Sequence, residues 1–391
     1  MPTNLVTSMR LIAATDTLSS IGPILTEYDI HGYAEHTPAG IASIRSIEVF
    51  RGNPRSGYLN LGKGFGFDAA LASGYMEAIE VSTIEQAPQV PVLGTGDLAP
   101  ASLVYTAARK AAQRAGMLDD KEKHRPVIGG VDLLTSMQVY GYVDENFLPQ
   151  QWSGERLHLS TDGLASGNSL AEARLHAIYE LLERHVAASS LRALGQVLSI
   201  ALEDIPLTLR EALDEIEQAG WRSEFFLLGW TLGVTVIQCA LSPLTAAKAG
   251  RLDVHFGWGA HHSLSIAVAR ALAEAVQGWA TRAACQLGNI PPARMKGGML
   301  LSSEQLMGLK SGSPVGEQIL HAHLRACRSA PASLGEADEG TLAAAPVALE
   351  QVLSRAREAG ISHVLSWTLS PPHRPFAVVK CVIPEFESLF S

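Results

Sequence analysis

The sequence predicts an α/β (α+β) fold in which helices pack against mixed sheets. The chain has 391 residues, of which 47% are hydrophobic and 18% are charged, enough to fill one large or two medium cores. Two segments repeat the order helix, strand, strand, which is typical of sheets with helices on their faces. Three other helices carry polar side chains within apolar stripes, so we expect them to lie between buried surfaces.

The first of these three helices is expected after an irregular N-terminal stretch. Up to about Arg55 no element is assigned. Apolar periodicity then predicts a helix over Phe67–Ser82, with Asp68 as its N-cap. The same periodicity predicts the second helix over Ala171–Ala188 and the third over Ser265–Arg282.

Between the first and second helices the sequence predicts a mixture of elements. A Pro/Gly-rich stretch over Ala87–Pro100 leads into a helix expected at Ala101–Ala115, which Gly116 is placed to end. Strands are expected at Val127–Asp132 and Met137–Val143, and a turn over Ser160–Asn168 opens the second helix.

The repeated unit occupies the second half of the chain. Each copy is a helix that starts at a proline and ends at a glycine, followed by two strands joined by a turn. The copies are helix Pro206–Gly220 with strands Arg222–Leu228 and Val234–Leu241, and helix Pro346–Gly360 with strands His363–Thr368 and Phe376–Ile383. The stretches Gly297–Gly316 and Ala330–Ala345 are expected to be surface loops or mobile segments.

The polar side chains of the three helices return to one side of each helix. They are Ser73, Glu77 and Glu80; then Glu172, Glu180 and Glu183, followed by Arg184; then Arg270, Glu274 and Gln277. A carboxylate removed from water must be paired, hydrogen-bonded or bound to a cation. The residues flanking these positions are mostly Ala, Leu, Ile and Val, which suggests that the acids are not simply solvated.

Several carboxylates beside basic groups suit a magnesium-nucleotide site. Mg²⁺ takes hard oxygen ligands and commonly bridges protein carboxylates to substrate phosphates. Lys63, Arg184 and Arg270 are then candidates for phosphate contacts. Simpler interpretations stay open: glutamates on one helix face are often solvated, Ser73 can be a small core residue, and Ser169 with Glu172 forms a capping box.

Two further motifs have both a functional and a plain interpretation. Gly62-Lys63-Gly64-Phe65-Gly66 resembles a nucleotide loop, because glycines let the backbone approach phosphate, but it is not a Walker A motif. The end of a glycine-rich hairpin explains it equally well. Either His261 or His262 can contact a substrate, or the pair can form a turn before the third helix.

Composition and charge exclude several classes of protein. The net charge of −9 argues against a nucleic-acid surface. The four cysteines show no zinc-finger spacing, which favours a reduced, cytoplasmic chain. Met1–Ile12 has no signal-peptide core, and no apolar run reaches the length of a membrane span, so we expect no membrane association.

On these motifs the chain resembles the YcaO superfamily. The matching blocks are Lys63 with the first polar triplet, Thr161–Ser169 with Glu172, Glu180, Glu183 and Arg184, and the triplet from Arg270 to Gln277. The resemblance implies a YcaO-type catalytic domain over residues 57–391, with 1–56 poorly assigned, that binds ATP and Mg²⁺. By position it implies metal and phosphate ligands at Glu77, Glu80, Glu180, Glu183 and Glu172, and nucleotide contacts at Lys63, Ser73, Asn168, Arg184, Arg270 and Glu274, with Gln277 closing the third block.

The resemblance also implies a reaction, ATP-dependent activation of a peptide backbone amide. A Cys, Ser or Thr side chain of the peptide as nucleophile gives an azoline, and an external sulfur donor gives a thioamide. Azoline-forming members often end in a proline-rich tail, whereas Val382–Ser391 contains one proline, which favours the thioamide branch. His185 stands where the family often has Asp, so no role is expected of it.

The resemblance implies partners as well. We expect a TfuA-like sulfur-delivery protein or a ThiF-like leader-binding protein, and a homodimer. Two other functions remain open from the sequence: a nucleotide-binding accessory protein for another modifying enzyme, such as a methylthiotransferase, and a metal-dependent phosphoester hydrolase.

Overall fold

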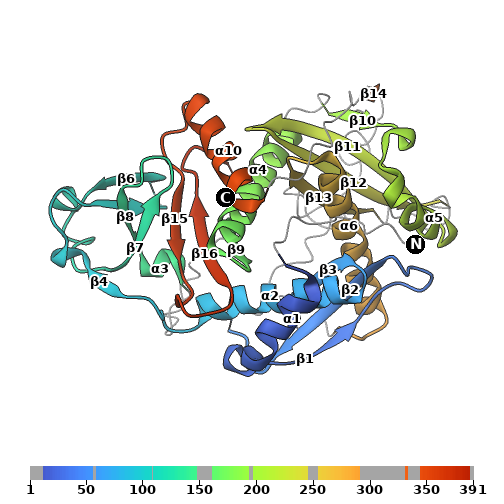
Figure 1. The fold of residues 1–391 in the computed structure, drawn as a ribbon, viewed down its shortest axis with the longest axis horizontal. Helices are drawn as coiled ribbons and strands as arrows, with labels where there is room; N and C mark the ends of the chain where they lie inside the picture. Colours follow the sequence, from blue (N-terminus) through green and yellow to red (C-terminus); the bar gives the residue numbers. More distant parts are fainter. Residues whose placement is uncertain are drawn as a thin grey trace.

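The described part of the chain forms three sheets held together by long helices. The computed structural model describes residues 12–55, 59–107, 109–147, 161–192, 197–244, 254–290, 331–332 and 344–387. Figure 1 shows helices α2, α4 and α6 between the sheets. This mixed α/β architecture confirms the predicted fold class.

The N-terminal sheet is antiparallel and is built mostly from residues to which the sequence analysis assigned no element. Helix α1 (Ala14–Ile21) and the 3-10 helix η1 (Gly22–Tyr28) precede its strands. The strands are β1 (Ile30–Glu35), β2 (Ile44–Arg51) and β3 (Asn60–Phe65). Ser46 of β2 lies opposite Lys63 of β3, so residues before 56 and after 59 share one sheet.

The largest sheet is mixed and has the order β6-β5-β8-β7-β15-β16-β9, with β4 paired to β7. The strands predicted at 127–132 and 137–143 are confirmed as β7 and β8. Short helices η2 (Thr95–Asp97), η3 (Ala115–Met117) and α3 (Val143–Asn146) lie between its strands. The strands are β4 (Val92–Gly94), β5 (Leu103–Thr106), β6 (Ala111–Arg114), β7 (Pro126–Asp132), β8 (Gln138–Tyr142), β9 (Leu164–Gly167), β15 (Leu365–Thr368) and β16 (Ala377–Val382).

The helix predicted at Ala101–Ala115 is wrong, because this segment forms strands β5 and β6. Its alanines favour a helix in isolation, but Leu103–Thr106 gains more by pairing in parallel with β8 and antiparallel with β6. Lys110 has a φ of 48°, which breaks a helix and suits the turn between the two strands. Gly116 accordingly lies in η3 and ends no helix.

The five-stranded sheet has the order β13-β12-β11-β10-β14. Both helix–strand–strand units are confirmed, and they contribute to different sheets: α5 with β11 and β12 here, and α10 (Ala345–Glu358) with β15 and β16 in the largest sheet. The elements of this part are β10 (Leu198–Ile200), η4 (Leu202–Asp204), η5 (Leu207–Leu209), α5 (Arg210–Gln218), β11 (Trp221–Thr231), β12 (Val234–Pro243), β13 (His255–His261) and β14 (Pro331–Ala332).

The three predicted polar helices are confirmed, and each one packs against two sheets. Helix α2 (Phe67–Glu85) contacts β3 and β9, α4 (Leu170–Arg192) contacts β9 and β13, and α6 (Leu264–Gln286) contacts β13 and β3. In Figure 1 the three helices lie around the middle of the molecule, between the three sheets. Contacts with β3 and β9 bring their polar side chains together there.

Two predicted details near these helices are corrected. The N-cap of α2 is Gly66, with a φ of 88° that suits glycine, and Asp68 lies in the first turn of the helix. The turn predicted over Ser160–Asn168 contains strand β9, because these residues pair with β16. The predicted loops Gly297–Gly316 and Ala330–Ala345 lie largely outside the described residues, apart from β14 and the start of α10.

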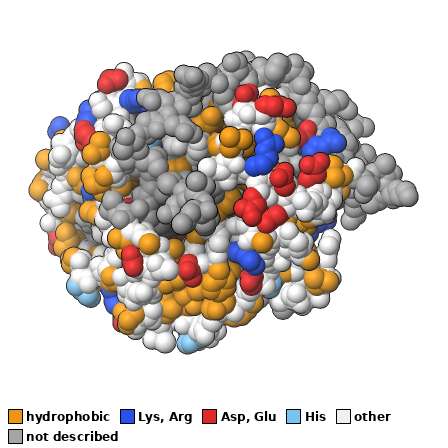
Figure 2. All heavy atoms as spheres, turned by 45° about the vertical axis from the view of Figure 1, so that its right-hand side comes forward, with side chains coloured by type: hydrophobic (Ala, Val, Ile, Leu, Met, Phe, Trp, Pro, Cys, Tyr) orange, Lys and Arg blue, Asp and Glu red, His pale blue; other side chains and the backbone are white. Residues whose placement is uncertain are grey.

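On the face seen in Figure 2, acidic and basic side chains are interspersed beside a largely apolar area. None of the described helices is long and apolar enough to cross a membrane.

Candidate active site

Side chains of α2 and α6 form hydrogen bonds with the same strand, β3. Glu77 Oε1 accepts a hydrogen bond from the backbone N–H of Leu61 at 3.2 Å, and Gln277 Nε2 donates to the carbonyl oxygen of Leu61 at 2.8 Å. Lys63 Nζ donates to Glu274 Oε2 at 2.8 Å. Three of the predicted site residues on helices therefore meet the strand that carries Lys63.

Helices α2 and α4 meet around strand β9. Glu80 Oε1 accepts hydrogen bonds from both the backbone N–H and the hydroxyl of Ser166, at 2.7 and 2.6 Å. Glu180 Oε2 accepts one from the N–H of Gly163, just before β9, at 3.1 Å. Acidic side chains of α2 and α4 thus accept hydrogen bonds from β9 or from the residue just before it.

Arg184 lies among the acids of α4. Its guanidinium is 3.8 Å from Glu180, 3.9 Å from Glu183 and 3.9 Å from Asp162. Burial alone would lower the pKa of Arg184, but the surrounding carboxylates raise it above its ordinary value. Asp162 was not predicted as a site residue, although it lies within the Thr161–Ser169 motif.

The start of α4 brings Asn168 and Glu172 together. Asn168 Nδ2 lies 3.4 Å from Glu172 Oε1, and the hydroxyl of Thr17 donates to Asn168 Oδ1 at 3.1 Å. Ser169 Oγ accepts a hydrogen bond from the N–H of Glu172 at 3.2 Å, as the capping-box interpretation predicts. Ser73 lies half-buried on α2, one turn before Glu77.

Helix α6 contacts a histidine of α4 that was not predicted as a site residue. Arg270 Nη2 lies 3.1 Å from His176 Nε2. His176 stands four residues after Glu172 and four before Glu180, so it shares their face of α4. That spacing was a usable signal in the sequence.

The acids of the site are held where ionisation is unfavourable. Burial and the nearby Glu180 and Glu274 raise the pKa of Glu77 to about 7. Burial and the neighbouring acids raise the pKa of Glu180 to about 8, and burial with Glu274 raises that of Glu183. Burial would also raise the pKa of Glu274, but Lys63, Arg184 and Arg270 bring it below its ordinary value.

The donor set fits a magnesium nucleotide, although the carboxylates do not yet form a coordination sphere. Among the described residues no three His, Cys, Asp or Glu side chains are positioned to hold a metal ion. Glu77, Glu80 and Glu180 instead accept hydrogen bonds from backbone N–H groups. A divalent cation would offset the mutual repulsion of the carboxylates, and hard carboxylate oxygens are its preferred ligands.

The glycines around Lys63 are explained by packing. A Cβ on Gly62 would lie 2.0 Å from the carbonyl oxygen of Ala70, and one on Gly64 would lie 2.8 Å from the backbone nitrogen of the same residue. Strand β3 therefore needs glycine at both positions to lie this close to α2. The glycine-rich motif forms this strand, and only Lys63 among its side chains contacts an acid of the site.

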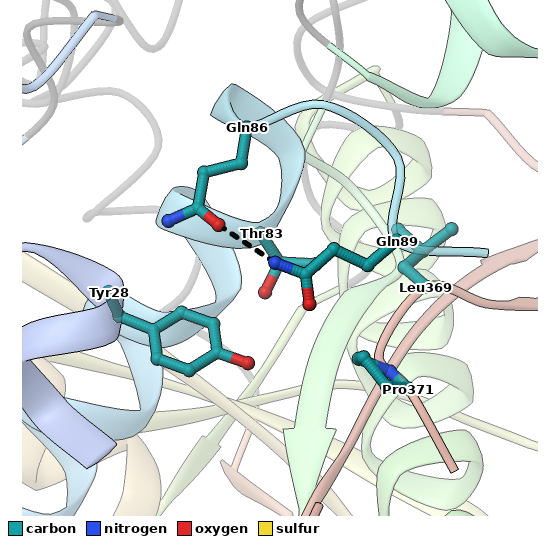
Figure 3. Close-up of a pocket in the computed structure, with 6 residues that line it drawn as sticks. All are labelled: Tyr28, Thr83, Gln86, Gln89, Leu369 and Pro371. Atoms are coloured by element: carbon teal, nitrogen blue, oxygen red, sulfur yellow. Dashed lines mark hydrogen bonds between the residues drawn. The ribbon is translucent and has the colours of Figure 1, made fainter.

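A separate hollow lies at the C-terminal end of α2. It is lined by six residues, which Figure 3 labels: Tyr28, Thr83, Gln86, Gln89, Leu369 and Pro371. Gln89 Nε2 donates to Gln86 Oε1 at 3.2 Å. None of the six lining residues is charged, so this hollow lacks the groups that bind a nucleotide phosphate.

The comparisons with known proteins agree with this arrangement. The sequence model of the family described as YcaO cyclodehydratase, ATP- and Mg²⁺-binding, matches residues 61–387. The protein Rv1375 of Mycobacterium tuberculosis H37Rv is 26% identical over 300 residues, which cover 73% of this chain and 64% of that protein. A Rhizobium leguminosarum bv. trifolii protein named for the tfuA 3′ region is 27% identical over 293 residues, covering 68% of this chain and 66% of that protein.

A solved structure shares the fold. The structure of YcaO from Methanopyrus kandleri, bound with AMPPCP and Mg²⁺, matches with a TM-score of 0.71 and 22% identity, covering 97% of this chain and 92% of that one. The chain thus spans about two thirds of the curated relatives and nearly all of this structure. The predicted resemblance and cofactors are confirmed: the chain belongs to the YcaO family, whose members bind ATP and Mg²⁺.

Proposed function

We propose that the chain is an ATP- and Mg²⁺-dependent enzyme that activates a backbone amide of a peptide by phosphorylation. The observation that carries this proposal is the meeting of α2, α4 and α6, which brings buried glutamates and three cationic side chains together. The clustered carboxylates suit a divalent cation, and Lys63, Arg184 and Arg270 suit the negative charge of phosphates. A magnesium nucleotide supplies both.

The residues divide into two groups in this proposal. Mg²⁺ neutralises charge on the phosphates when bound, and its ligands are Glu77, Glu80, Glu180 and Glu183, with Glu172 at the start of α4. Lys63, Arg184 and Arg270 face the phosphates as cations. The remaining nucleotide contacts are Ser73, Asn168 and Glu274, while Gln277 holds α6 to β3.

The proposed reaction transfers a phosphoryl group and needs no oxidant or reductant. A nucleophile adds to the amide carbon before, or together with, the attack of the amide oxygen on the γ-phosphorus of ATP, and ADP leaves. The phosphorylated oxygen then departs from that carbon as inorganic phosphate. The cations of the site stabilise the charge that develops on the transferring phosphoryl group. A sulfur donor as nucleophile gives a thioamide, and a peptide side chain gives an azoline.

The thioamide branch, with a TfuA-like partner that delivers sulfur, is our preferred version. The name of the rhizobial relative, which refers to the tfuA 3′ region, supports this choice. A leader-binding partner and an azoline product form the second version of the same chemistry. We further propose that the catalytic unit is a homodimer.

The test measures ADP formation and peptide mass together. The full chain is incubated with Mg-ATP alone and with a mixture of peptides containing Cys, Ser and Thr, with and without sulfide and a co-expressed TfuA-like protein. We expect ADP formation to require peptide, and a thioamide to appear as replacement of oxygen by sulfur. Loss of water would assign an azoline instead. Hydrolysis of a simple phosphoester without any use of ATP would overturn the proposal.

A further inference from the structure

Arg270 differs from the other cations of the site in what holds it. Lys63 pairs directly with Glu274, and Arg184 lies among Glu180, Glu183 and Asp162. Arg270 makes no ion pair within 4.0 Å to any carboxylate of the described residues. Within the described residues its hydrogen-bonding contact is Nη2 to His176 Nε2 at 3.1 Å.

The hydrogen bond between Arg270 and His176 can have only one donor. A guanidinium only donates hydrogen bonds, so His176 Nε2 must be the acceptor and the imidazole must be neutral in this contact. A neutral acceptor orients Arg270 without cancelling its charge. The charge still reaches the acids. Together with Lys63 and Arg184, Arg270 brings the pKa of Glu274 below its ordinary value, and it partly offsets the burial that raises the pKa of Glu183.

The guanidinium also keeps a donor for a ligand. Arg270 Nε is buried and has no hydrogen-bond partner among the described residues. A buried N–H group without a partner is costly unless a ligand or water accepts from it. Arg270 therefore has both charge and a donor to offer a ligand.

An aromatic cluster links α4 to the residues just before α6. His261, at the end of β13, stacks on His262 with ring centroids 4.2 Å apart, and Tyr179 of α4 packs edge-on against His261 at 5.1 Å. The hydroxyl of Tyr179 is hydrogen-bonded to His262 Nδ1. Tyr179 precedes Glu180 on α4, so the cluster joins the acid-bearing helix to the segment that leads to Arg270.

We propose that His176 is a positioning residue that presents Arg270 to the nucleotide phosphates as a cation without a direct carboxylate partner among the described residues. This inference rests on the proposed function, because it assigns Arg270 to the phosphates of ATP. It predicts that the site tolerates another neutral acceptor at position 176 but tolerates neither the loss of the acceptor nor a negative charge there.

The test compares three substitutions by calorimetry with the ATP analogue AMPPCP and Mg²⁺, using the full chain. In His176→Gln the amide oxygen replaces Nε2 as acceptor, and we expect affinity within about threefold of wild type. In His176→Leu the acceptor is lost, and affinity should fall about tenfold. In His176→Glu the carboxylate keeps the contact but cancels the charge, and affinity should fall by about tenfold or more.

Thermal unfolding of each variant separates positioning from stability, and His373→Leu, which removes an exposed histidine between β15 and β16, is the matched control. The order Gln above Leu and Glu in affinity, without the same order in melting temperature, supports the inference. Equal affinity in all three variants overturns it, as does a loss in every variant that follows its melting temperature. Absence of binding in the wild type would overturn the proposed function itself, and the inference with it.

Discussion

Lys63 Nζ lies 2.8 Å from Glu274 Oε2, so a direct ion pair joins strand β3 to helix α6 across the candidate site. The two side chains are 29% and 22% exposed, which places the pair at the rim of the acidic region. Partly exposed pairs contribute little to folding, about 1 kcal/mol or less. The pair is therefore not expected to be needed for folding, which leaves Lys63 free to serve the phosphate contact proposed for it.

Lys63→Met is expected to weaken binding of the magnesium nucleotide by about tenfold, because it removes one phosphate cation. The free energy of unfolding should change by less than about 1 kcal/mol. Calorimetry and urea unfolding measure the two quantities separately. A marked loss of stability with unchanged nucleotide binding would assign the pair a structural role.

Glu183→Gln is expected to abolish ATP turnover while the protein stays folded. Burial and Glu274 raise the pKa of Glu183, so its carboxylate is disfavoured in the ligand-free fold and a neutral amide of similar size relieves that cost. The melting temperature without ligand should therefore stay equal or rise.

The matched control for this variant is Glu217→Gln, an exposed glutamate on α5. It removes the same charge away from the site, and turnover should stay at the wild-type rate. Turnover that survives in Glu183→Gln would show that Glu183 is not a metal ligand.

Without Mg²⁺, the free energy of unfolding should fall as the pH rises, which is the reverse of the usual effect of a carboxylate. The pKa of Glu180 rises from 4.5 to about 8 on folding, so the folded state binds the proton more tightly than the unfolded state. The stabilising contribution is complete below pH 4.5 and is lost as the pH rises through about 8. Urea unfolding across this range, on wild type and Glu180→Gln, measures it.

Two results qualify this pH prediction. The Glu180→Gln variant should show a flatter loss of stability, and Mg²⁺ with nucleotide should favour the ionised acids and reverse the trend. A wild-type stability that rises with pH over the same range, in the absence of metal, would contradict the raised pKa.

Gly62→Ala is expected to destabilise the protein by about 3 kcal/mol or more, because the new Cβ would lie 2.0 Å from the carbonyl oxygen of Ala70. Gly22→Ala is the control, since nothing lies within 4 Å of its Cβ. Urea unfolding of both variants tests this. Equal stability of the two would mean that β3 and α2 are not in close contact.

Sequence patterns predicted the long helices and the repeated units because each has a strong period of its own. They failed at Leu103–Thr106, where pairing with β8 overrides the helical preference of the neighbouring alanines. They also failed at Leu164–Gly167, whose strand depends on β16, a segment more than 200 residues away. Long-range pairing of this kind leaves no local signal.

For the site, the sequence indicated the acids but not how they are held. Apolar flanks indicated that Glu77 and Glu180 are withdrawn from water, and the structure leaves both half-buried and near each other. The sequence could not show that Arg270 contacts His176, because that contact depends on how α4 and α6 approach. Nor could it show that the glycines around Lys63 serve helix packing.

The central claim is that the polar faces of α2, α4 and α6 form one magnesium-nucleotide site. Isothermal calorimetry with AMPPCP, with and without Mg²⁺, tests it most directly on the wild type and Glu183→Gln. We predict binding that requires Mg²⁺ and is lost in the variant. Absence of binding in the wild type, or binding that is unchanged by Mg²⁺ and by the substitution, would contradict the account.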